Sequence, residues 1–203
     1  MRFRHLLAFV VVAFVSVLGS RSHAQATARR YLEQKNEQVN SILRESPRTD
    51  AARERRQEEL TRLLSGLLDF EALSRAALSE HWEARSPAER ERFVTLLRQL
   101  VERNYQSNLE RILDYEITYD GETVRGESTV VTTTARSRTE RRQPPIEIEY
   151  TLRREGNDYR VVDVRTDGVS MVQNYRTQFG RIIDREGWGE LISRMEHRLA
   201  DED

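Results

Sequence analysis

Apolar residues recur every three or four positions through the first half of the chain, which predicts amphipathic helices. These helices are expected at about residues 26–45, 49–68, 69–81 and 86–113. Pro47 ends the first, and Asp69 can cap the third. The clearest start signal is Ser86-Pro87-Ala88-Glu89, because Ser86 and Glu89 can form a capping box and proline suits the first helical position.

From Tyr115 onward the apolar period shortens to about two and β-branched residues become frequent. Residues 146 to 152 alternate strictly between apolar and polar, which predicts a strand with one solvated face. A turn is expected at residues 155–158, and in total we predict four antiparallel strands. Helix resumes near Ser170, breaks at Gly187 and continues to about Leu199. Helices followed by strands and then helices predict one α+β domain.

The first 24 residues have the pattern of a secretory signal peptide. Arg2 and Arg4 precede thirteen uncharged residues, 6–18, and Ser22-His23-Ala24 is a small-x-small cleavage pattern. A membrane anchor is the alternative, but thirteen helical residues span only about 20 Å, against ~30 Å of hydrocarbon. We therefore predict a signal peptide at 1–24 cleaved after Ala24 or Ala26, one domain at 25–200, and an acidic tail at 201–203.

Charge and composition exclude several classes of function. The chain carries 33 basic and 34 acidic residues, a net charge of −1, and loss of three leader arginines would change it to −4. No basic excess supports nucleic-acid binding. The absence of cysteine excludes disulfides, thiolate metal sites and a lipid-modified cysteine, so we expect a soluble periplasmic protein. Lys35 is the one lysine, so no Walker-type phosphate loop exists.

Catalytic patterns are weak. After the leader only His81 and His197 remain, neither at metal-ligand spacing, and no nucleophile motif occurs. Asp163 or Asp167 could act as a general base inside a cone-shaped fold. The prediction is nevertheless a protein that is not an enzyme and has no metal or cofactor.

The Arg-rich stretch 136–142 could contact phosphate or an acidic partner, or be a solvated strand edge.

Two blocks of sequence resemble a known family. The first runs from Leu68-Asp69-Phe70-Glu71-Ala72-Leu73 through Trp82 and the Ser86 capping box to Phe93 and Tyr105. The second is Tyr159-Arg160-Val161-Val162-Asp163-Val164, followed by Gly168-Val169-Ser170-Met171-Val172-Gln173-Asn174-Tyr175-Arg176-Thr177-Gln178-Phe179. Together they resemble the MlaC family, the periplasmic phospholipid-binding component of the Mla transport system.

The resemblance implies an NTF2-like α+β fold, with N-terminal helices packed on a curved four-stranded antiparallel sheet and C-terminal helices following it. It also implies an apolar pocket for both acyl chains of a phospholipid, with the headgroup near the mouth. The implied partners are an inner-membrane complex of an ABC transporter with an MCE protein and an outer-membrane lipoprotein complex.

The candidate lipid-binding residues are inward positions of the elements that carry this resemblance: Leu67, Phe70, Leu73, Phe93, Leu97, Val101, Tyr105, Ile148, Tyr150, Val169, Met171, Val172 and Tyr175. Gln173 and Arg176 are candidates for the cavity mouth. Each apolar candidate could equally belong to the core, because periodicity does not distinguish the two. Two alternatives stay open: an NTF2-like envelope enzyme with a buried carboxylate, and a protein adaptor without a lipid cavity.

Overall fold

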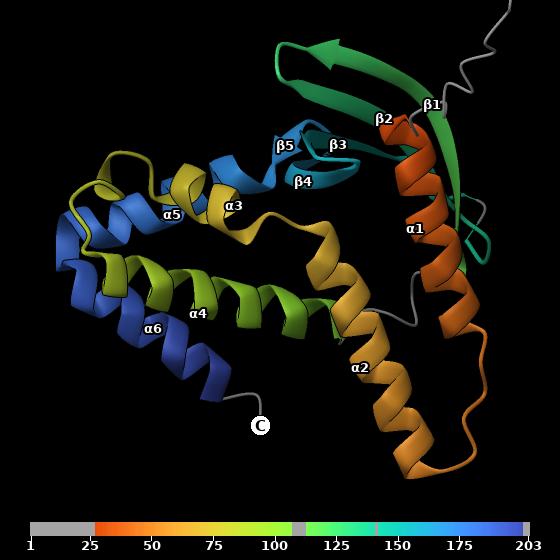
Figure 1. Cartoon of the computed structure of the whole chain (residues 1–203), viewed down its shortest axis with the longest axis horizontal. Helices are drawn as coiled ribbons and strands as arrows, with labels where there is room; N and C mark the ends of the chain where they lie inside the picture. Colours follow the sequence, from red (N-terminus) through yellow and green to blue (C-terminus); the bar gives the residue numbers. More distant parts are fainter. Residues whose placement is uncertain (1–26, 107–112, 141, 201–203) are drawn as a thin grey trace, which may run out of the picture.

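The computed structural model describes residues 27–106, 113–140 and 142–200, apart from the side chains of Tyr105 and Gln106. Helices and strands follow in the predicted order (Figure 1). The helices are α1 (Ala28–Leu43), α2 (Asp50–Leu67), α3 (Phe70–Leu78), the 3-10 turn η1 (Ser79–His81), α4 (Pro87–Gln106), α5 (Met171–Glu186) and α6 (Trp188–Ala200). The strands are β1 (Tyr115–Arg125), β2 (Ser128–Ser137), β3 (Ile146–Glu155), β4 (Asp158–Thr166) and β5 (Val169–Ser170). The predicted α+β class is confirmed.

Helix ends follow the local sequence signals. The Asp69 carboxylate accepts the Ala72 N–H at 2.9 Å, which confirms the predicted cap of α3. The capping box before α4 also forms: Glu89 Oε2 accepts the Ser86 N–H at 2.8 Å, and Ser86 Oγ accepts the Glu89 N–H at 3.3 Å. Gly187, with φ 91°, ends α5 in the left-handed region that glycine tolerates best.

The five strands form one antiparallel meander in the order β1-β2-β3-β4-β5. The prediction of four strands was therefore wrong by one. The additional strand, β5, is only two residues long and pairs Ser170 with Arg165 and Val169 with Thr166. A strand this short has no alternation to detect, and its Ser170 is the residue near which the sequence predicts the next helix to begin.

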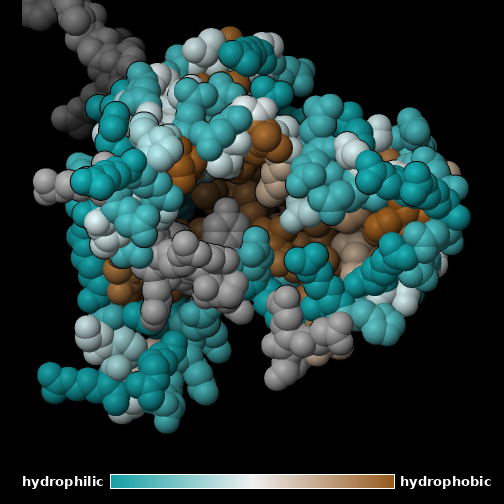
Figure 2. All heavy atoms as spheres, turned by 180° about the vertical axis from the view of Figure 1, so that it is seen from behind, coloured by the Kyte–Doolittle hydropathy of each residue, from teal (hydrophilic) through white to brown (hydrophobic). Residues whose placement is uncertain are grey.

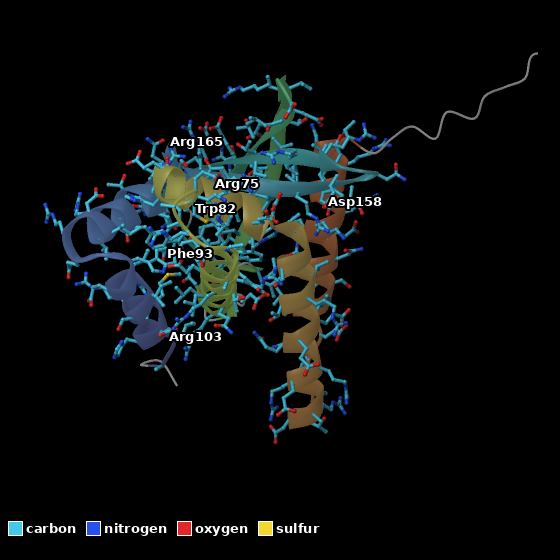
Figure 3. The ribbon with its side chains drawn as sticks, turned by 60° about the vertical axis from the view of Figure 1, so that its left-hand side comes forward. Arg75, Trp82, Phe93, Arg103, Asp158 and Arg165 are labelled. Atoms are coloured by element: carbon cyan, nitrogen blue, oxygen red, sulfur yellow. The ribbon has the colours of Figure 1, made fainter. Side chains whose placement is uncertain are left out.

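One face of the sheet is divided between two environments. Val131, Leu152 and Val161 are all fully buried and belong to the main hydrophobic core with α3 to α6. Phe93 of α4 lies inside this helical part of the core, with its ring centroid 5.5 Å from Phe179 (Figure 3). The other half of this sheet face is the half that α1 and α2 approach.

Helices α1 and α2 form a hairpin at one side of the molecule, where α2 contacts the C-terminal end of α4 (Figure 1). It has a small core of its own, made of Val39, Ile42, Leu43 and Leu60. The C-terminal end of the hairpin is fixed to the sheet, because the Asp69 N–H donates to the Val161 carbonyl at 3.0 Å. Within the described ranges, none of the helices combines the length and apolarity needed to cross a membrane.

Candidate binding site

An apolar cavity of about 450 Å³ lies between the α1–α2 hairpin and the sheet. On one face of the molecule, apolar side chains gather inside a hollow that polar side chains surround (Figure 2). The cavity is of the size used for small-molecule binding, roughly 300–1,000 Å³. Its lining residues come from α1, α2 and four strands: Leu32, Lys35, Asn36, Val39, Leu63, Leu64, Leu67, Tyr115, Ile117, Tyr119, Ala135, Ile146, Ile148, Tyr150, Val164 and Thr166.

Strand alternation explains the wall that the sheet contributes. In β1, Tyr115, Ile117 and Tyr119 line the cavity, whereas the intervening residues are exposed. Across the sheet, Ile117 lies opposite Ala135 and Tyr150 lies opposite Val164. A run of aromatic and aliphatic side chains therefore continues across four strands on one face.

Tyr119 connects this wall to α1. Its hydroxyl donates to the Leu32 carbonyl at 3.3 Å. Burial of the phenol, with a smaller contribution from the Glu33 carboxylate, raises the pKa of Tyr119 to about 12. The phenol therefore stays neutral at all ordinary pH values and does not bring charge into the cavity.

The polar part of the lining lies mainly on α1. Among the described residues that line the cavity, Lys35 carries the one formal charge. Its ammonium nitrogen lies 5.4 Å from the centroid of the Tyr31 ring, within the range of a cation–π contact. Asn36 and Thr166 are the other non-aromatic polar side chains. The site thus combines a large apolar wall with one cation at its edge.

The structure brings three predicted lipid-binding residues to this cavity: Leu67, Ile148 and Tyr150. Six others are buried in the main core, namely Phe70, Leu73, Phe93, Leu97, Val101 and Val172. Met171 and Tyr175 are partly buried against the same core, and Val169 is 64% exposed on β5. The Tyr105 side chain lies outside the described positions. For all these residues, lipid contact stays a prediction.

Neither of the two predicted mouth residues lines the cavity. Gln173 lies exposed in the first turn of α5, where its N–H donates to Ser170 Oγ at 3.0 Å. Arg176 donates from Nε to the Ala76 carbonyl at 2.9 Å, which ties α5 to the C-terminal end of α3. Their role at a cavity mouth stays a prediction that this arrangement does not favour.

The two carboxylates considered as general bases have structural partners. Asp163 accepts from Ser170 Oγ at 2.7 Å and from the Val172 N–H at 3.1 Å, which fixes the start of α5. Asp167 accepts the Glu147 N–H at 3.1 Å. Neither lines the cavity, and among the described lining residues no aspartate, glutamate or histidine occurs.

Part of the Arg-rich stretch lies at the cavity edge. The Arg138 Nε donates to the carbonyl of the lining residue Tyr115 at 3.3 Å, and its N–H donates to the Asp114 carbonyl at 2.7 Å. Arg136 and Arg142 are exposed, whereas Arg141 lies outside the described residues. This placement matches the solvated strand edge that was one of the two expectations.

Sequence reasoning missed most of the sheet wall and the polar part of α1. The alternation of Tyr115, Ile117 and Tyr119 with polar residues was a signal that could have identified the wall. For α1, Lys35 lies four residues after Tyr31, and Asn36 four after Leu32, so both follow its apolar face. A polar residue on an apolar helical face is the pattern to look for.

Fold and site together define a class: an α+β protein in which helices close an apolar cavity against one face of a meandering antiparallel sheet. The family model described as MlaC protein matches residues 33–197, and the chain belongs to the MlaC family. Among solved structures, it is similar to the phospholipid-binding protein from Ralstonia solanacearum in complex with a phospholipid. The TM-score is 0.72 at 20% identity, with 87% of this chain and 98% of that chain covered. No curated protein matches by sequence.

Proposed function

We propose that this protein binds a phospholipid, with acyl chains held in the cavity between the α1–α2 hairpin and the sheet. The observation that carries the proposal is the cavity itself: about 450 Å³, walled by aliphatic and tyrosine side chains from six elements. Membership of the MlaC family supports it. The similar Ralstonia solanacearum protein, a phospholipid-binding protein that was solved with a phospholipid, supports it as well.

The energetics favour a carrier over a tight receptor. Burying one methylene is worth about 0.8 kcal/mol, so roughly 30 methylenes in two acyl chains give on the order of 24 kcal/mol relative to water. In a bilayer the same methylenes are already dry. Exchange between protein and membrane is therefore nearly balanced, while escape into water is negligible. A dry apolar cavity is sufficient for this task, without strong polar contacts.

The location and partners of the carrier follow from this role. The protein is exported by the signal peptide at residues 1–24 and acts in the periplasm as one domain, residues 25–200. There it shuttles phospholipid between an outer-membrane lipoprotein complex and an inner-membrane complex of an ABC transporter with an MCE protein. The MlaC family match and the signal-like leader support this part of the proposal.

The two alternative functions have less support. An enzyme of NTF2-like architecture needs a reactive group in its cavity, and Asp163 and Asp167 instead hold backbone and side-chain donors elsewhere. A pure adaptor predicts a large exposed apolar patch. In the described part of the chain, the large exposed hydrophobic residues are Val124 and Val169, which belong to different strands.

The test is to extract lipid from purified protein, identify it by mass spectrometry, and block the cavity with Ala135→Phe. Ala135 is 4% exposed and lines the cavity, so a phenyl ring there occupies space that the acyl chains need. The matched control is Thr132→Phe, which puts the same ring on the opposite face of the same strand.

We expect about one phospholipid per wild-type and Thr132→Phe molecule, and at least a five-fold reduction for a folded Ala135→Phe protein. Circular dichroism and the unfolding midpoint establish that the variants are folded. Wild-type protein that carries no phospholipid and takes up none from vesicles would refute the proposal. Equal loading of a folded Ala135→Phe protein would refute this cavity as the site.

A further inference from the structure

The apolar cavity adjoins a second, polar groove of about 670 Å³ on the α1–α2 hairpin. Lys35 and Leu63 line both, so the two spaces meet at these residues. The groove runs along the hairpin beside the β3–β4 turn, and Asp158 at that turn lies near α1 (Figure 3). The rest of its lining is mostly polar and includes the charged residues Glu45, Glu59, Arg62, Asp158 and Arg160.

Lys35 is the charged group at the junction of the two spaces. Its side chain is half-buried, and its ammonium faces the ring of Tyr31, which itself packs on Tyr159 with centroids 5.9 Å apart. Across the described residues, Lys35 has no carboxylate partner within ion-pair distance. A half-buried ammonium held by an aromatic ring, and not neutralised by a carboxylate, is available to an external anion.

The other charged residues of the groove differ from Lys35 in their partners or in their position. Arg160 is already paired, because its Nε lies 2.7 Å from Glu155 Oε2. Arg62 lies in α2 beside Leu63 on the groove lining, and Glu59 follows one helical turn toward the tip of the hairpin. Of the groove cations Lys35, Arg62 and Arg160, Lys35 is the one that also lines the apolar cavity. The groove carboxylates Glu45 and Glu59 lie toward the hairpin tip, and Asp158 lies at the β3–β4 turn.

We propose that Lys35 binds the phosphate of the phospholipid, and that the rest of the headgroup extends into the groove between α1 and α2. This inference rests on the proposed function. In a phospholipid the phosphodiester is joined to both acyl chains through one glycerol, so chains inside the apolar cavity place the phosphate at its polar edge. The cation at that edge is Lys35. The mouth of the site is thus on the α1–α2 hairpin, away from Gln173 and Arg176 on α5.

Lys35→Gln tests the contact, with Arg30→Gln as the matched control. Arg30 is exposed on the same helix, lines neither space, and its replacement changes the net charge by the same amount. Lipid-free proteins are loaded with phosphatidylglycerol or with diacylglycerol of identical chains, and transfer to acceptor vesicles is followed. We expect Lys35→Gln to release phosphatidylglycerol about three- to ten-fold faster, the effect of losing one partly exposed charge-assisted hydrogen bond, and diacylglycerol at the wild-type rate.

A second measurement uses the fact that Lys35 is the one lysine in the chain. Reductive methylation with ¹³C-formaldehyde gives one dimethyl-lysine NMR signal, separate from that of the α-amino group. Phosphatidylglycerol is expected to shift this signal, because its phosphate binds the ammonium directly. Diacylglycerol and 10 mM inorganic phosphate are expected to leave the signal close to its lipid-free position.

The outcomes separate this inference from the proposed function. Wild-type protein that binds neither lipid contradicts the proposed function. Wild-type protein that binds phosphatidylglycerol, with unchanged release from Lys35→Gln and an unchanged Lys35 NMR signal, overturns the role of Lys35 alone. An equal response to inorganic phosphate also overturns it, since it would show a general anion site.

Discussion

At the scale of single residues, one helical pattern places apolar side chains in two environments, the cavity wall and the core. Phe93 and Leu67 follow the same helical periodicity, yet Phe93 is fully buried among helices and Leu67 lines the cavity. A core position and a cavity-wall position each require an apolar side chain, so the spacing of apolar residues along the helix is the same in the two environments. Only the path of the chain in space, which brings α1 and α2 over half of the sheet, distinguishes them. Leu67, Ile148 and Tyr150 could therefore be predicted as apolar, but not specifically as cavity residues.

Tyr119 gives a prediction about pH. The pKa of Tyr119 is raised from 10 to about 12 in the folded state. The folded state therefore gains stability from keeping this phenol neutral, and the gain is complete below pH 10 and is lost as pH rises toward 12. Tyr119→Phe also removes the hydrogen bond to Leu32, at a cost of about 0.5–1.5 kcal/mol near neutral pH. We expect the free energy of unfolding of wild type, relative to that of Tyr119→Phe, to fall steadily as pH rises from 10 to 12.

Urea unfolding of both proteins at pH 8, 10 and 11.5 measures that difference. The other tyrosines are common to both proteins, so their titration cancels. A difference that stays constant up to pH 11.5 would mean that Tyr119 ionises equally in the folded and unfolded states, contrary to the buried environment described here.

At the scale of elements, capping signals and alternation predicted the helices and the four long strands well. Asp69 and Ser86 both cap where expected, because these bonds depend on a few consecutive residues. What failed was β5, whose two residues have no periodicity. The hairpin was also not anticipated as a separate unit with its own core, because that core depends on contacts between α1 and α2.

The small core of the hairpin gives a prediction about lipid release. Leu60 is 1% exposed in that core, and Leu191 is 1% exposed in the main core. Either Leu→Ala substitution is expected to cost about 2–5 kcal/mol in unfolding free energy. Only Leu60→Ala loosens the wall of the cavity, so it should speed phospholipid transfer to vesicles several-fold, whereas Leu191→Ala should leave the rate near wild type.

Transfer of a fluorescent phospholipid, measured at a temperature where both variants are folded, distinguishes the two. Equal rates for both variants would show that release follows global stability and not the packing of the α1–α2 hairpin.

At the scale of the whole molecule, the sequence alone was sufficient for the α+β class, since helices, strands and helices follow each other in blocks. The position of the cavity was not predictable, because it depends on the half of the sheet that α3 to α6 leave uncovered. The block from Gly168 to Phe179 carried the resemblance to the MlaC family, and the family model matches residues 33–197. That block itself packs against the core, as Val172 and Phe179 show.

The signal-like segment at residues 1–24 gives a prediction about the mature N-terminus. The exported protein is expected to begin at Gln25 or Thr27, and its formal charge to be −4 instead of −1. Either cleavage leaves Thr27 in place, whose hydroxyl accepts the Arg30 N–H at 3.2 Å at the start of α1. Intact mass measurement of protein from the periplasmic fraction checks this. Replacing both Ala24 and Ala26 by arginine should block cleavage. A mature mass from that double variant would contradict the predicted cleavage sites.

The divided sheet face has a consequence for how such proteins diversify. Val131, Leu152 and Val161 maintain the fold, whereas Ile117, Ile146 and their neighbours line the cavity. Substitutions in the second group alter the volume and shape offered to a cargo without disturbing the packing that the first group provides. Cargo preference and foldability can thus change independently, although both are encoded on the same strands.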